Sequence, residues 1–450
     1  MESCLNLIYP VPPTGQNHRI NLVDFDRQPD WPINRIFIYP TLDIIHLKRA
    51  LERALSLWSI MCGHAEIVDA IKDTYSIVCS DRGIPYTYIE NTELDQWPTD
   101  LPVVLSDSSK FRPYIDPVCN EILNSAPFLR IKITYLTRSK EYIFGVSFSH
   151  VIGDAKSAAM FLSNVSRLYQ NLEPLITTPV FERRLLLKEN SNSNILTRMK
   201  IFHEGISKEK IIEECRIENQ TTDPITMFFS SKHVTQLRQQ IHNVNSFIST
   251  NDLLNAYVIF RLNTHFFRSN ENPIQRAYVT VNYRGLCPNI CSLNQIGNCF
   301  IHILTEDFAD PYSLSSIAQM LRQSISKARD ESYLLSHLTT ENFVFKEFKD
   351  KQLIGNWNRL ENEVSINSQY KLDWVEQVDL GMTNQCRMHL SFTKKFTFFV
   401  FRSNPTRAID GTWTRDEGAA EISFRIPRGT QKESFLQAWI DDMSEDFMNV

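Results

Sequence analysis

Apolar and polar positions recur along the chain with two periods, which together predict a mixture of helices and strands. From Leu42 to Trp58, apolar residues return every three or four positions with charged residues between them, so we expect an amphipathic helix. Phe128 to Leu136 alternates apolar and polar side chains, the period of a half-buried strand. A second strand is predicted at Tyr142 to Ser149, followed by a helix whose apolar face runs from Ala158 to Tyr169.

The pattern weakens after residue 175 and becomes regular again near residue 226. Further elements are predicted as strands at Arg35–Tyr39, Tyr75–Val78, Met227–Ser230, Ala277–Tyr283, near Leu390 and at Phe396–Phe401, and as helices at Val234–His242, Leu253–Leu262 and Ile317–Ala328. Their order lacks the regular strand–helix–strand repeat of a doubly wound fold. We therefore predict an α+β protein with one lobe over 1–175, a crossover segment over 176–225 and a second lobe over 226–450.

The amino-acid composition indicates a globular protein and argues against nucleic-acid-binding and membrane-spanning classes. Hydrophobic residues make up 42% of the 450 and charged residues 22%, which is typical of a globular chain. Lys and Arg number 47 against 52 Asp and Glu, a net charge of −5, so a nucleic-acid-binding surface is not expected. The apolar runs are far shorter than the roughly 18–20 residues that span a bilayer. Nine scattered cysteines favour reduced thiols and a cytoplasmic protein.

Several common kinds of site find no support. The chain has no G-x-G-x-x-G, no G-x-x-x-x-G-K-[ST] and no G-x-S-x-G motif. Cys287, Cys291, Cys299 and His302 could be imagined as a zinc set, but their spacing matches no common zinc module. Ser149 lies at a predicted strand end without the turn that activates a nucleophilic serine. We therefore expect no metal and no serine nucleophile.

The segment from Phe148 to Ala155 carries the most informative chemistry. A predicted strand delivers His150 to its end, and Asp154 stands where a helix begins. Histidine has the side-chain pKa nearest neutrality, so it can accept a proton from a hydroxyl or an amine. The alternative is a structural histidine, with Asp154 as an ordinary helix N-cap. The H-x-x-x-D spacing alone leaves both interpretations open.

Other segments, taken in order, extend this motif. The set resembles the BAHD acyltransferase family, whose members have the chloramphenicol-acetyltransferase-like fold. The matching segments are Pro13-Thr14, Leu22-Val23-Asp24 with Ile36–Tyr39, the helix from Leu47 to Gly63, His150–Asp154, Ser249–Ala256, Val281–Gly285 and Gly297-Asn298.

The resemblance implies an architecture and an activity. Each lobe would be a mixed sheet with flanking helices, with an active-site channel at the lobe interface. The protein would be a monomer without a tightly bound cofactor, and would move an acyl group from acyl-CoA to a small-molecule alcohol or amine. His150 would be the general base. Asp154 would pair with Arg284 to support the site, while Ser249 and Thr250 would either contact coenzyme A or simply cap a helix.

One segment departs from the family pattern. The second family signature, D-F-G-W-G, is matched only by Asp379-Leu380-Gly381-Met382-Thr383, which keeps Asp379 and Gly381. This degenerate signature motivates one rival hypothesis, a non-catalytic scaffold with the same fold. A second rival is a condensation-type enzyme that uses a carrier-protein thioester; such enzymes have another histidine before the base, where this chain has Ser149.

Overall fold

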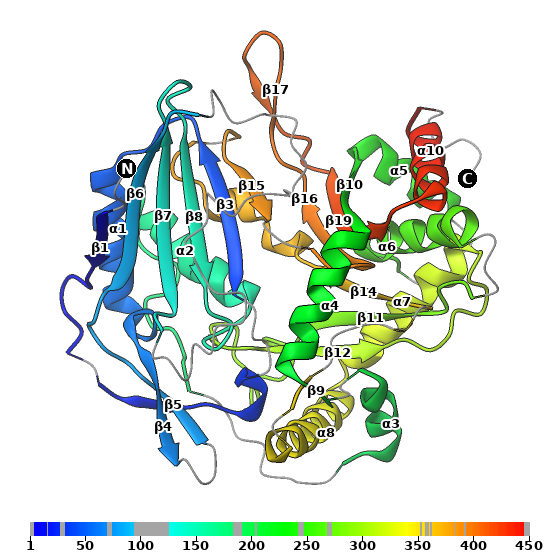
Figure 1. The fold of residues 1–450 in the computed structure, drawn as a ribbon, viewed down its shortest axis with the longest axis horizontal. Helices are drawn as coiled ribbons and strands as arrows, with labels where there is room; N and C mark the ends of the chain where they lie inside the picture. The colour runs from blue at the N-terminus through cyan, green and yellow to red at the C-terminus, as the bar shows by residue number, and fades with distance from the viewer. Residues whose placement is uncertain are drawn as a thin grey trace.

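Two lobes lie side by side in the computed structural model, each built on a six-stranded sheet (Figure 1). The structure describes residues 4–15, 17–27, 32–69, 74–93, 126–182, 191–202, 205–241, 247–267, 272–351, 353–355, 360, 362–382, 384–390 and 393–444. The two-lobed α+β architecture predicted from the sequence is confirmed.

The first sheet forms the N-terminal lobe. Its strand order is β1 (Cys4–Ile8), β6 (Ile84–Asn91), β7 (Leu129–Leu136), β8 (Tyr142–Phe148), β3 (Ile33–Tyr39) and β15 (Arg387–Leu390). Two helices, α1 (Ile44–Leu57) and α2 (Ala155–Tyr169), bury their apolar faces in the core of this lobe. A smaller sheet pairs β2 (Arg19–Asn21), β5 (Thr74–Val78) and β4 (His64–Asp69).

The second sheet forms the C-terminal lobe. Its strand order is β10 (Thr222–Phe229), β19 (Ala420–Pro427), β16 (Thr397–Arg402), β14 (Glu363–Ser368), β11 (Arg276–Asn282) and β12 (Phe300–Leu304). The accompanying helices are α5 (Ser231–Gln240), α6 (Thr250–Arg261), α7 (Leu314–Ala328), α8 (Glu331–Asp350) and α10 (Thr430–Ser444). The short α9 (Trp374–Gln377) instead packs against α2 and buries Trp374 and Val375 in the core of the N-terminal lobe. Short pairs join β9 (Gly205–Ile206) to β13 (Ile354–Gly355), and β17 (Thr406–Arg407) to β18 (Trp413–Thr414).

The two faces of the second sheet differ in polarity. Val279 and Ile366, which are paired across β11 and β14, belong to the apolar core with α6 and α7. Successive side chains of a strand point to opposite faces. The opposite face therefore carries Tyr278 with its partner Ser365, and also Thr280 of the same strand. Part of the sheet thus presents polar groups on the face turned away from its own core.

The lobes exchange segments. β15 follows most of the C-terminal lobe in sequence, yet it pairs antiparallel with β3 in the N-terminal sheet (Figure 1). Its buried Arg387 donates to Glu141 over 2.7 Å. In the opposite direction, Phe25 packs its ring against Phe300 and Phe345 of the C-terminal lobe. The lobe boundaries predicted at residues 175 and 226 therefore do not account for β15, which lies in the second range but pairs in the first sheet.

The predicted crossover segment contains regular structure. In its described part lie α3 (Ser193–Phe202), β9 and α4 (Lys208–Thr221). α3 packs against α8 beside the edge strand β12, and α4 leads directly into β10 (Figure 1). The segment therefore contributes to the C-terminal lobe as well as connecting the two halves.

Candidate active site

A tight loop between β8 and α2 holds His150 at the junction of the lobes. The backbone N–H of Ser149 donates to the carbonyl of Phe128 over 2.8 Å, which fixes the start of the loop against the residue that precedes β7. The hydroxyl of Ser149 accepts from the N–H of Val151 at 3.2 Å. These bonds fix the backbone on both sides of His150.

The imidazole of His150 is oriented by Asn298, which comes from the C-terminal lobe. Its Nδ1 lies 3.0 Å from Oδ1 of Asn298. The amide nitrogen of Asn298 donates to the carbonyl of His150 at 2.8 Å and to Oδ1 of Asp26 at 3.1 Å. Because these two acceptors fix the amide, Oδ1 is the atom that faces the ring. Nδ1 then carries the proton, and Nε2 keeps a free lone pair.

The surroundings of His150 favour the neutral imidazole. Burial lowers the pKa of His150 below its ordinary value. The hydrogen bond to Asn298 and the charge of Asp154 act in the opposite direction but do not reverse the shift. The unprotonated ring is the form that can accept a proton near neutral pH.

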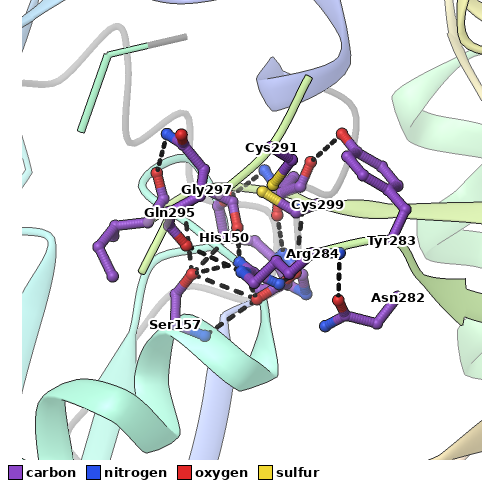
Figure 2. A network of polar contacts seen from close by, with 12 residues as sticks. His150, Ser157, Asn282, Tyr283, Arg284, Cys291, Gln295, Gly297 and Cys299 are labelled. Atoms are coloured by element: carbon purple, nitrogen blue, oxygen red, sulfur yellow. Dashed lines mark hydrogen bonds and ion pairs between the residues drawn. The ribbon is translucent and has the colours of Figure 1, made fainter. Parts of the chain in front are cut away.

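Asp154 and Arg284 form a buried ion pair between the lobes. The Asp154 carboxylate accepts from both terminal nitrogens of Arg284, at 2.7 and 2.9 Å. Arg284 also donates to the carbonyls of Gln295 and Gly297 over 2.8 and 2.7 Å. Figure 2 shows these groups converging with Ser157 in one network. The bidentate geometry joins the start of α2 to the segment that follows β11.

Asp154 and Arg284 each stabilise the charged form of the other. Burial alone would raise the pKa of Asp154, but Arg284 and the backbone donors Ser157 and Cys299 lower it below its ordinary value. Burial alone would lower the pKa of Arg284, but the Asp154 carboxylate raises it. Both groups are therefore charged at neutral pH, as a hydrogen-bonded buried pair requires.

Asp154 also caps a helix. Its Oδ1 accepts from the backbone N–H of Ser157, 3.0 Å away, at the first turn of α2. Asp154 is thus both the helix N-cap that the sequence offered and the partner of Arg284 that the family resemblance implied. Gly153 allows the close approach of this loop to the other lobe, since a Cβ there would lie 2.6 Å from Oγ of Ser157 and 3.2 Å from the nitrogen of Gly297.

The sequence motifs assigned no function to two residues of this network. Asn298 belonged to the Gly-Asn match, but nothing in the sequence assigned it to His150. The opening motif was matched with Asp24, whose side chain lies outside the described residues, whereas Asp26 is the acid in the site and is only 1% exposed. The L-S-x-x-D spacing, counted from Leu22, ends at Asp26 and could have identified it.

Ser249 and Thr250 lie at the start of α6. Ser249 is its N-cap and forms a capping box with Asp252, while its hydroxyl also accepts from Arg322 at 2.7 Å. Thr250 accepts from Arg238 at 3.0 Å. The capping function is therefore present, and both hydroxyls lie next to arginines.

The degenerate second signature forms a turn against α2. The carbonyl of Asp379 accepts from Ser166 and Gln170, and its carboxylate accepts from the N–H of Met382 at 2.6 Å. Gly381 has a φ of +82°, a conformation that favours glycine. Thr383 lies outside the described residues.

The cysteine and histidine set considered for zinc is not gathered into a metal site in the described residues. In the described part of the chain, no three His, Cys, Asp or Glu side chains are grouped to hold a metal ion. Cys291 and Cys299 lie in the network of Figure 2, whereas Nδ1 of His302 contacts the hydroxyl of Thr280 at 3.2 Å. None of the described helices combines the length and apolar character needed to cross a membrane.

A family model described as the Transferase family matches residues 6–363, well over half of the chain. The chain belongs to this family, the BAHD acyltransferases. This assignment confirms the resemblance drawn from the sequence motifs. No curated protein matches the sequence.

Solved structures share the fold of this BAHD protein at low sequence identity. Vinorine synthase is 17% identical, with a TM-score of 0.67 over 98% of both chains. TRI101 of F. graminearum, complexed with coenzyme A and T-2 mycotoxin, is 13% identical, with a TM-score of 0.71 over 94% of this chain and 98% of its own. The first condensation domain of the CDA synthetase is 10% identical, with a TM-score of 0.54 over 96% and 97%.

Proposed function

We propose that this protein transfers an acyl group from acyl-CoA to a hydroxyl or amine of a small molecule, with His150 as the general base. The observation that carries the proposal is an imidazole whose Nδ1 faces the amide oxygen of Asn298, which leaves Nε2 as the basic atom at the junction of the lobes. TRI101, which has the same fold, was solved with coenzyme A and T-2 mycotoxin bound.

The reaction follows from the position of this base. Nε2 of His150 takes the proton of the acceptor while the acceptor oxygen or nitrogen attacks the thioester carbonyl, and a C–O or C–N bond forms. The tetrahedral intermediate then breaks its C–S bond. The departing thiolate of coenzyme A takes the proton from the imidazolium, so the free thiol leaves and the base is restored.

The remaining residues support this step at a distance. Asp154 and Arg284 hold the His150 loop against the C-terminal lobe without touching substrate. Ser249 and Thr250 are proposed as contacts for coenzyme A, because both hydroxyls lie at the positive end of α6 beside Arg238 and Arg322. The protein is proposed to act as a cytoplasmic monomer with acyl-CoA as co-substrate and no resident cofactor.

Thiol release tests the proposed activity. Purified protein is incubated with several acyl-CoA donors and pooled alcohols and amines, and free coenzyme A is measured with and without acceptor. We expect acceptor-dependent release that falls by about 10²–10⁴-fold in His150→Ala. The matched control is His46→Ala on α1, where the ring packs at a tilt against Tyr169, and it should keep the wild-type rate.

The outcomes separate the competing functions. Release that is the same in His150→Ala and wild type would remove the general base. If no donor gives acceptor-dependent release, the non-catalytic scaffold is favoured. Transfer only from an acyl group loaded on a carrier protein would indicate the condensation-type enzyme.

A further inference from the structure

Arg35 is a buried cation at the junction of the lobes. Only 7% of the residue is exposed, and in the described part of the chain no carboxylate is paired with it. Its Nε has no hydrogen-bond partner among the described residues. Burial lowers the pKa of Arg35 to about 9, so the side chain still carries its charge at neutral pH. A buried charge without a counter-charge destabilises the fold, so its presence calls for an explanation.

Both lobes hold this guanidinium in place. Its Nη2 donates to Oε1 of Gln369, in the segment after β14, over 2.8 Å. The same oxygen accepts from Nε1 of Trp374 at 2.8 Å. The guanidinium carbon lies 4.7 Å from the centre of the Trp374 ring, within the range of a cation–π contact. The charge is therefore fixed in position by groups that are themselves neutral.

The strand register brings Arg35 toward the end of β8. β3 and β8 are neighbours (Figure 1), and Ile33 is paired with Phe148, two residues before His150. Nη1 of Arg35 donates over 2.8 Å to the carbonyl of Asn34, which precedes it in β3. The guanidinium is therefore turned back toward the start of β3, and so toward the end of β8 that carries His150.

The charge of Arg35 acts on His150. Burial is the main cause of the lowered pKa of His150, and the positive charge of Arg35 lowers it further. The hydrogen bond to Asn298 and the charge of Asp154 raise it. Arg35 therefore opposes the groups that favour the protonated ring.

Other charged and titratable groups surround the ring, but each has a partner or lies beside one. They are Asp26 of η1 (Asp24–Arg27), Lys156 of α2, Arg284 and Cys299 in the segments that join β11 to β12, and His302 of β12. Asp26 accepts from Asn298, and Arg284 is neutralised by Asp154. Lys156 interacts with both members of that ion pair. Arg35 differs from them because it acts on His150 without a carboxylate of its own.

We infer that Arg35 is a positioning residue whose fixed positive charge holds His150 in the unprotonated form. The inference rests on the proposed function, because a general base must be unprotonated to accept a proton. Arg35 needs no contact with either substrate for this effect. Its charge would extend acyl transfer to lower pH than burial of the ring alone allows.

Direct titration of His150 tests this inference. The full-length protein is labelled isotopically at Cε1 of histidine, and NMR follows the signal that disappears in His150→Gln as the pH is changed. In Arg35→Met, which carries no charge, the ring should become protonated at higher pH than in wild type. At a pH below the midpoint, the fraction of neutral ring should fall by about three- to tenfold. Arg35→Lys keeps a positive charge and should titrate like wild type.

Arg387 of the neighbouring strand β15 provides a matched control. It is 1% exposed and lies 4.9 Å from the centre of the Trp413 ring, but Glu141 is its partner. Arg387→Met should therefore leave the titration of His150 unchanged.

Thermal melting separates the effect of charge from damage to the fold. Arg387→Met should melt at a lower temperature than wild type, because it leaves a carboxylate without its partner. Arg35→Met should melt close to wild type, because it removes a buried charge that has no counter-charge. Should Arg35→Met fail to fold, Arg35→Gln repeats the titration with an uncharged side chain that can still donate to Gln369.

Thiol release from acetyl-CoA with pooled alcohols and amines gives the second measurement. The acid limb of this activity should move to higher pH in Arg35→Met and should stay in place in Arg35→Lys. An Arg35→Met titration that matches wild type overturns the inference, and so does an equal change in Arg35→Lys or Arg387→Met. If the titration moves in Arg35→Met but no acyl donor gives acceptor-dependent release, the proposed function fails while the effect of Arg35 on the ring stands.

Discussion

Asn298 determines which nitrogen of the His150 ring is basic as well as where the ring lies. An asparagine amide can face an imidazole with either end, and the two choices leave opposite nitrogens of the ring basic. Here Asp26 and the carbonyl of His150 both accept from the amide nitrogen, so the orientation is decided by two other partners. These partners come from the N-terminal lobe, whereas Asn298 comes from the other.

Replacing Asn298 should change the pH dependence of the reaction. In Asn298→Ala the ring loses the hydrogen bond that raises its pKa, so the pKa of His150 should fall further. The acid limb of kcat/KM, which reports the free base, should then move to lower pH. The rate at its optimum should drop by about 10- to 100-fold because the ring is no longer held in position.

The control for this experiment is Asn294→Ala, an exposed asparagine of the same segment. Its pH profile should match that of wild type. An Asn298→Ala protein that is slower but has an unshifted acid limb would show that Asn298 supports the fold without tuning the base.

Among the elements, α2 and the segment after β11 depend on each other through Asp154 and Arg284. Arg284→Ala would leave a carboxylate with no counter-charge in a buried position. We expect the free energy of unfolding to fall by about 3–5 kcal/mol, as is usual when one partner of a buried pair is removed. Urea unfolding measures the change, and acyl transfer should fall in parallel.

An exposed pair of the same type provides the comparison. Arg216 and Glu213 lie on α4 with side chains 57% and 53% exposed. Arg216→Ala should therefore leave the free energy of unfolding close to that of wild type. Similar losses in Arg284→Ala and Arg216→Ala would mean that the buried pair does not lock the lobes.

Sequence periodicity identified the elements that have one apolar face. The predicted helix at Leu42–Trp58 is α1, and the alternating segment at Phe128–Leu136 is β7. α8 escaped prediction because its core-facing side includes His337, Thr340 and Glu341, which interrupt an apolar stripe. An apolar stripe that is interrupted in this way is harder to recognise in the sequence.

Only part of the candidate site could be predicted from the sequence. His150, Asp154 and Arg284 lie in motifs with fixed spacing, so each could be named from the sequence. The partners that orient the ring depend on contacts between residues 272 positions apart, such as Asn298 with Asp26.

At the scale of the whole molecule, the strand exchange couples the two lobes. Met388 and Leu390 of β15 belong to the core of the N-terminal lobe, although the chain reaches them only after β14 of the other sheet. Unfolding the C-terminal lobe would withdraw β15 from β3 and expose those side chains. Unfolding one lobe alone would therefore carry the free-energy cost of exposing these apolar side chains.

The chain should therefore unfold in one cooperative transition. We expect calorimetry to give a single peak whose calorimetric and van't Hoff enthalpies agree, which two independent lobes would not give. Met388→Ala removes buried apolar volume from β15, so it should destabilise the molecule by about 2–5 kcal/mol and move the whole peak to lower temperature. Two resolved peaks in wild type, or a Met388→Ala protein in which only part of the peak shifts, would show that the lobes unfold separately despite sharing a strand.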